Sequence, residues 1–129
     1  MVAFVIFLGA GLGGLGRYVV SMWVQTASGT DFPWGTLLIN ITGSALLTLV
    51  YGLLEGTAAP SEWRAFLGIG VLGGFTTFST FSFEAMRLLQ DGEWERALAY
   101  VVGSVVLSLA GAALGFRLAS VLTAVLRRG

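Results

Sequence analysis

Ten consecutive residues in the third of four hydrophobic stretches carry groups suited to handling an ion inside a membrane. Residues 73–82 read Gly-Gly-Phe-Thr-Thr-Phe-Ser-Thr-Phe-Ser, with five hydroxyl side chains and three phenylalanines. Such a run weakens a helix, because glycine costs backbone entropy and hydroxyls compete for backbone hydrogen bonds. Within lipid, broken helix is tolerated only where protein or a cavity surrounds it. We therefore predict a third helix broken at its centre. A continuous helix, with hydroxyls bonded to its own carbonyls, is the alternative.

A break of this kind would expose groups for ions of either sign. Freed carbonyl oxygens are ligands for a small cation such as Na⁺. Phe75, Phe78 and Phe81 recur at every third position, and an aromatic ring has a positive edge. Ring edges, with hydroxyl and amide donors, could replace the water around a small anion without the tight binding of a fixed cation. Apolar packing is the ordinary interpretation of the same spacing.

Two further stretches carry polar stripes at helical spacing. Asn40, Ser44 and Thr48 lie four residues apart in the second stretch, so they share one helix face. In the fourth stretch the corresponding stripe is Tyr100, Ser104 and Ser108. Either stripe alone is typical of hydrogen bonding between membrane helices. Together the two stripes could line a polar path through lipid.

Two charged positions have competing interpretations. Arg17 falls inside the first hydrophobic stretch. A charge there is a functional hypothesis by default, here a positive charge at the mouth of an anion path, although a long side chain near a helix end also snorkels to the interface. Glu84 precedes Arg87 by three residues, which predicts a local ion pair. A proton-coupling carboxylate is the alternative for Glu84.

The elements that must position these residues are membrane-spanning helices. The 129 residues are 56% hydrophobic and only 11% charged, with a mean hydropathy of +0.86, whereas soluble domains are about 25% charged. A span needs about 20 apolar residues. We predict an all-α integral membrane protein that forms a single domain over residues 1–129, with spans at about 2–24, 34–54, 63–89 and 96–126.

Composition also excludes several classes of function. The chain has no Cys and no His, and its seven basic residues, all Arg, balance seven acids. Thiolate metal sites and the usual general base are therefore missing, and no basic patch is available for nucleic acid. The glycines at residues 9–14 match a dinucleotide fingerprint, but they lie inside a span, where close helix packing is the better interpretation.

The motifs resemble those of one known family. Residues 73–82 resemble the signature of the CrcB/Fluc family of fluoride ion channels. Residues 34–43 (WGTLLINITG) resemble its second-helix motif, and residues 13–18 (GGLGRY) its first. The likeness extends over the whole chain, in length and in its four helices. In the family, Leu often stands where this chain has Phe75.

The resemblance implies an antiparallel, dual-topology homodimer in a prokaryotic inner membrane, with two separate pores that export fluoride passively and relieve its toxicity. The Arg residues show only a weak preference for one side of the predicted spans, and this agrees with dual topology. The resemblance also implies a structural Na⁺ at the dimer centre, held by the carbonyls of Gly73 and Thr76 from both subunits, and places Arg17 near the vestibule. The fluoride pathway would contain Asn40, Phe78, Phe81, Ser79, Thr80, Tyr100 and Ser108.

Three other functions compete with a channel. A small drug or cation exporter needs a membrane-embedded carboxylate, and Glu84, the one candidate, lies near a span end beside Arg87. A non-transporting membrane subunit would use the polar stripes only to join helices, and it would not need the glycine break. An enzyme is the weakest alternative, because no nucleophile has a base near it.

Overall fold

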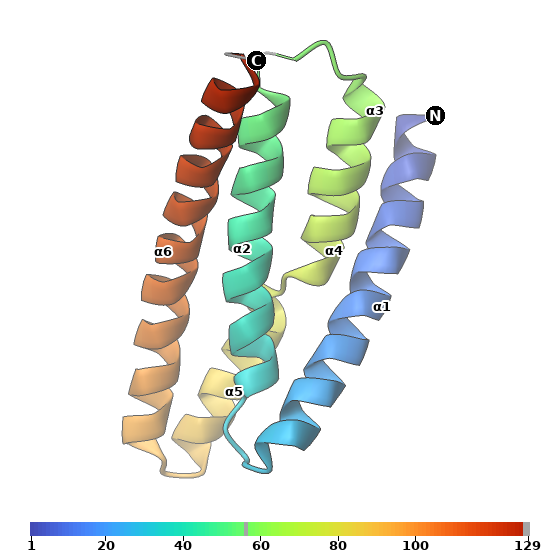
Figure 1. The fold of residues 1–129 in the computed structure, drawn as a ribbon. Coiled ribbons are helices and arrows are strands. Elements are labelled where there is room, and N and C mark those ends of the chain that lie inside the picture. Colours follow the sequence, from blue (N-terminus) through green and yellow to red (C-terminus); the bar gives the residue numbers. More distant parts are fainter. Residues whose placement is uncertain (56, 128–129) are drawn as a thin grey trace.

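The computed structural model describes residues 1–55 and 57–127. Figure 1 shows that they form an all-helical bundle with both termini at the same end. Four helical segments are long and apolar enough to cross a membrane, which confirms the predicted fold class. The elements are α1 (Val2–Ser28), α2 (Trp34–Leu54), α3 (Ser61–Arg64), η1 (Ala65–Leu72), α4 (Gly73–Phe75), α5 (Phe78–Gln90) and α6 (Trp94–Leu126).

The predicted boundaries are right for α2 and slightly short for the other spans. Helix α1 continues four residues beyond the predicted end, to Ser28, and stops at Gly29, whose positive φ of 62° terminates the helix. Gln25, just beyond the predicted end of this span, is still helical, and its side-chain amide donates to the carbonyls of Thr30 (2.6 Å) and Phe32 (3.0 Å).

The third span runs from Ser61 to Gln90 and consists of four pieces. Its helix is interrupted at Thr76 and Thr77, which have extended backbone, as predicted. Figure 1 shows α5 continuing behind the other helices after this interruption. The π-helical turns of η1 (Ala65–Leu72) were not predicted. Wide turns of this kind are rare and are often found near functional sites.

Glycines let the helices approach closely on both sides of α2. Helix α1 packs on η1, and α2 packs on α6. A methyl group at Gly9 would lie 2.6 Å from the Phe66 carbonyl oxygen, and one at Gly111 would lie 3.0 Å from that of Ile41. These contacts, with that of Gly13 against the Val71 backbone, confirm helix packing as the role of Gly9 and Gly13, whereas a methyl group at Gly11 or Gly14 would contact nothing within 4 Å.

A small apolar core closes the end of the bundle that carries loops 29–33 and 91–93, here called the loop end. Phe32 packs against this core from the loop that joins α1 to α2. The core therefore fixes α5, α6 and the start of α2 relative to one another, just beyond the break. Its buried members are Leu37, Phe81, Ala85, Leu88, Ala97 and Tyr100.

Candidate ion pathway at the break in the third span

Asn40 holds the break open. Its side-chain nitrogen donates to the Thr77 carbonyl (2.9 Å), and its side-chain oxygen accepts from the Thr77 N–H (2.8 Å). This paired contact satisfies both backbone groups of a residue that has left the helix. Because unpaired backbone groups are costly in a membrane, Asn40 stabilises the interrupted conformation.

Thr77 then begins a new helix. Its hydroxyl accepts from the Thr80 N–H (3.2 Å), donates to the Thr80 hydroxyl (3.1 Å) and lies 3.2 Å from the Ser79 hydroxyl. This is a side-chain N-cap of α5. The hydroxyls of Ser79 and Thr80 therefore contact the cap itself. The break also gives α5 an N-terminus inside the span, where the helix dipole favours an anion.

The same contacts release two carbonyl groups. In a continuous helix the N–H groups of Thr77 and Thr80 would bond to the carbonyls four residues earlier, which are those of Gly73 and Thr76. Asn40 and the Thr77 hydroxyl take these donors instead. Carbonyl oxygens freed in this way suit a hard cation such as Na⁺. The Thr76 carbonyl has a replacement donor, because it accepts a hydrogen bond from the Arg17 guanidinium at 3.5 Å.

A first cavity of about 330 Å³ opens on one side of the break. It brings together four of the predicted pathway residues: Asn40, Phe78, Phe81 and Ser108. The rings of Phe78 and Phe81 are 5.3 Å apart, and Phe78 is 78% exposed in this chain while Phe81 is 8% exposed. None of the described residues that line this cavity is charged. Its other lining residues are Ser44, Thr76, Thr77, Ser104, Val105 and Leu109.

Ser104 has the one buried side-chain polar atom without a hydrogen-bond partner within residues 1–55 and 57–127. The residue is 6% exposed and lines the first cavity. Buried polar groups nearly always have partners, so this hydroxyl is a candidate donor for a bound ion. Sequence analysis included Ser104 in a stripe that could line a polar path, but the pathway residues implied by the family resemblance did not include it.

A second cavity of about 270 Å³ lies on the other side of the break. Arg17 and Thr80 line it, and Thr77 lines both cavities. Arg17 therefore sits beside the break rather than at the end of α1. A cation here gives the second cavity a positive wall that the first one lacks. Its remaining lining residues are Gly14, Tyr18, Ser21, Met22, Thr36 and Ile39.

Tyr100 lies behind Phe81 and not in either cavity. It is fully buried, and its ring is 5.3 Å from that of Phe81. Its hydroxyl donates to Glu84 Oε2 (2.7 Å), while the Thr36 hydroxyl donates to Glu84 Oε1 (3.0 Å). Glu84 thus joins α2, α5 and α6 at the loop end.

The predicted ion pair between Glu84 and Arg87 is wrong. Glu84 bonds to hydroxyls of α2 and α6, and the Arg87 guanidinium lies 5.9 Å from the centre of the Phe83 ring instead. A spacing of three residues makes the pair possible. It does not show which face of α5 turns toward the other helices, and Glu84 lies on that inner face.

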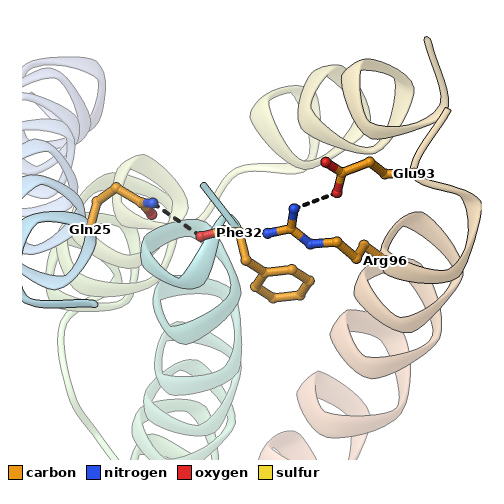
Figure 2. Close-up of polar contacts among 4 residues, drawn as sticks. All are labelled: Gln25, Phe32, Glu93 and Arg96. Carbon is orange, nitrogen blue, oxygen red and sulfur yellow. Dashed lines mark hydrogen bonds and ion pairs between the residues drawn. The ribbon is translucent and has the colours of Figure 1, made fainter. Parts of the chain in front are cut away.

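Phe32 lies between Gln25 and Arg96 at the loop end, as Figure 2 shows. Gln25 binds the Phe32 carbonyl, and the Arg96 guanidinium lies 5.9 Å from the Phe32 ring centre and pairs with Glu93. The Phe32 ring meets the Tyr100 ring edge-on at 5.6 Å. Phe32 therefore packs beside Tyr100 where the bundle opens to the loops.

This arrangement defines a class: a four-span membrane protein whose broken third helix lies between two small cavities, each lined in part by polar side chains. The family model described as CrcB-like protein, Camphor Resistance (CrcB) matches residues 4–116. The chain therefore belongs to the CrcB family. This agrees with the resemblance of its motifs and excludes the enzyme alternative.

Curated relatives match most of the chain. A protein of Thermus thermophilus named Fluoride-specific ion channel FluC is 52% identical over 116 residues, which cover 89% of this chain and 91% of the relative. One of Paramagnetospirillum magneticum with the same name is 47% identical over 118 residues, covering 89% and 92%. Fluoride-specific ion channel FluC 2 of Nitrobacter hamburgensis is 46% identical over 120 residues, covering 92% and 96%.

Proposed function

We propose that this protein is a fluoride-selective ion channel. The observation that carries the proposal is the first cavity, where the buried Ser104 hydroxyl has no partner among the described residues and lies near two phenylalanine rings and the N-terminus of α5. The names of the relatives support fluoride as the ion.

The first cavity suits a small anion for chemical reasons. A fluoride ion that leaves water needs several short contacts with donors or positive edges. Asn40 has a second amide proton besides the one given to Thr77, Ser104 and Ser108 have hydroxyls, and Phe78 and Phe81 have positive ring edges. Because none of these groups is a full cation, the ion can leave again. Chloride is larger and more weakly hydrated, so it gains less from such a site.

The second cavity is proposed as the vestibule. Arg17 would attract the anion, and the hydroxyls of Ser79 and Thr80 would receive it at the break. Thr77, which lines both cavities, is the point of passage between them. Tyr100 would continue the polar track toward the loop end, beyond Phe81.

Export is proposed to be passive and to relieve fluoride toxicity, with the protein in a prokaryotic inner membrane. The first cavity is open, since Phe78 is 78% exposed on one protomer. We infer that a second copy in antiparallel orientation covers it, so that a homodimer contains two pores.

A structural Na⁺ at the dimer centre is part of the same proposal. The carbonyls of Gly73 and Thr76 have lost their helical donors to Asn40 and Thr77. One protomer supplies few of the oxygens that a hard cation prefers. The same two carbonyls from both protomers would double that number around a shared ion.

The experiment is anion efflux from liposomes that contain the purified protein, with fluoride and chloride measured by ion-selective electrodes. A Phe78→Ile variant removes one ring of the first cavity. A matched Phe116→Ile variant removes a ring of α6 that is 53% exposed and outside the cavities. We expect fluoride loss without chloride loss, little fluoride loss from Phe78→Ile, and normal loss from Phe116→Ile.

Two results would contradict the proposal. A folded protein that releases no fluoride is not a channel, and the membrane-subunit alternative would then apply. Fluoride release that requires an opposing proton or cation gradient would instead favour the exporter alternative, with Glu84 as its carboxylate.

A further inference from the structure

Glu84 is the one charged side chain that bonds directly to a proposed pathway residue's side chain within residues 1–55 and 57–127. Both of its oxygens are engaged, one by the Tyr100 hydroxyl at 2.7 Å and one by the Thr36 hydroxyl at 3.0 Å. Neither cavity wall at the break includes this carboxylate. The contacts of Glu84 therefore lie at the loop end of the proposed polar track, beyond Phe81.

The bond from Tyr100 has a consequence for an anion on the track. A tyrosine hydroxyl has one proton to donate, and in this structure that proton points to Glu84. The oxygen then presents only lone pairs to any other neighbour, and these repel an anion. Tyr100 can bind fluoride only after its bond to Glu84 is released.

Glu84 and fluoride thus compete for the same donor. Both are anions, and hydrogen bonds to charged groups are stronger than those between neutral groups. The carboxylate is tethered to α5, so it reoccupies the hydroxyl as soon as the ion moves on. An internal competitor of this kind weakens ion binding at one position and speeds release there.

A cavity beside Glu84 can accommodate its carboxylate after the bond to Tyr100 is released. Glu84 lines a third cavity of about 580 Å³ at the loop end, together with Arg87 from α5 and Arg96 from α6. Their two guanidiniums offer donors in this cavity. The same cavity contains Asp31, Asp91 and Glu93, of which Glu93 already pairs with Arg96.

We propose that Glu84 is a built-in competitor of the permeating anion: it holds the Tyr100 hydroxyl while the track is empty, yields it to fluoride, and takes it back when the ion moves on. This inference rests on the proposed function. It makes Glu84 a positioning residue that acts through Tyr100 and sets how tightly the channel holds its ion.

The test measures initial fluoride efflux from proteoliposomes at a series of internal fluoride concentrations. A Glu84→Gln variant keeps the size and the hydrogen-bonding capacity of the side chain but removes its charge. We expect the half-saturating fluoride concentration to fall by about tenfold, because a neutral acceptor competes more weakly for Tyr100. The maximal rate should also fall, since a tighter ion leaves more slowly. Glu95→Gln neutralises an exposed carboxylate at the same end and should change neither quantity.

Two further variants extend the test, and the first of them keeps it decisive if Glu84→Gln is poorly folded. Glu84→Asp retains the charge but is one methylene shorter, so it no longer reaches Tyr100 and should also tighten fluoride binding. In a Tyr100→Phe background, Glu84→Gln should leave the half-saturating concentration unchanged, because the contested hydroxyl is gone.

The inference is overturned if Glu84→Gln and Glu84→Asp lower the maximal rate while the half-saturating concentration stays the same or rises. Glu84 would then only join the three helices. This outcome differs from failure of the proposed function, in which the wild-type protein itself releases no fluoride.

Discussion

The contact between α2 and α6 has two parts that use similar residues differently. Toward the termini, Thr48 of α2 donates to the Ala112 carbonyl of α6 at 2.8 Å, and Gly115 lies against Thr48 and Ala45. Toward the loop end, Asn40 of α2 bonds to Thr77 of the third span rather than to α6, and Ser104 of α6 has no partner in the described part of the chain. The part toward the termini joins α2 to α6 by hydrogen bonding and close packing. The part toward the loop end leaves the Ser104 hydroxyl without a partner among the described residues.

The difference follows from what lies beside each part. Glycines on α6 bring its backbone close to α2, so the Thr48 hydroxyl lies within hydrogen-bonding distance of an α6 carbonyl. Beside Asn40 and Ser104 the third span is broken, and a cavity takes the place of a helix contact. Small polar residues at helical spacing therefore serve packing or ion binding according to the neighbouring backbone.

Asn40→Leu should have the largest effect on stability. It leaves the Thr77 N–H and carbonyl without partners, and each buried group costs about 1–3 kcal/mol, so the free energy of unfolding should fall by about 2–6 kcal/mol. Fluoride efflux should also be lost, because the break is no longer held. Denaturant unfolding of the detergent-solubilised protein, compared with efflux, measures both. Wild-type stability in this variant would show that Asn40 does not hold the break.

Gly115→Ala should have a smaller effect, confined to packing. The added methyl group meets Thr48 and the Ala45 backbone, and overpacking costs about 1–3 kcal/mol. Gly103→Ala is the matched control on the same helix, because a methyl group there contacts nothing within 4 Å. Equal melting temperatures for the two variants would mean that the contact between α2 and α6 is looser than described.

Thr48→Val should lower the free energy of unfolding by about 0.6–1.7 kcal/mol, the range for hydrogen bonds between membrane helices. Its hydroxyl is outside the cavities, so fluoride efflux per folded protein should not change. A clear loss of efflux would place Thr48 on the pathway and remove the distinction between the two parts.

Ser104→Ala should give the smallest change in stability. In contrast to Thr48→Val, it should affect fluoride binding and not the free energy of unfolding. Its hydroxyl has no partner to lose within the described residues, so the unfolding free energy should stay the same or rise slightly. Fluoride binding should weaken by about tenfold, the loss expected for one hydrogen bond to a charged group. Unchanged half-saturation in the efflux assay would mean that Ser104 does not contact the ion.

Much of this fold could be predicted from the sequence. The four spans follow from apolar length, and the break follows from Gly73, Gly74 and the hydroxyl residues behind them. The resemblance named the family. These predictions depend on composition and local backbone preference, which the sequence contains directly.

The partners of the polar groups could not be predicted in the same way. Spacing places Asn40 and Ser104 on helix faces, but it does not show that Asn40 binds the Thr77 backbone or that Glu84 turns toward Tyr100 rather than Arg87. The π-helical turns before the break also have no local signal. Each of these features depends on how far the helices rotate when they pack.

Fluorine NMR of the protein reconstituted in lipid with fluoride tests the central claim most directly, because it reports the bound ion itself. The account predicts a bound-fluoride resonance that is lost or strongly weakened in Ser104→Ala and retained in Thr48→Val. A bound resonance of equal strength in both variants would contradict the account, since the ion would then be held away from the free hydroxyl beside the break.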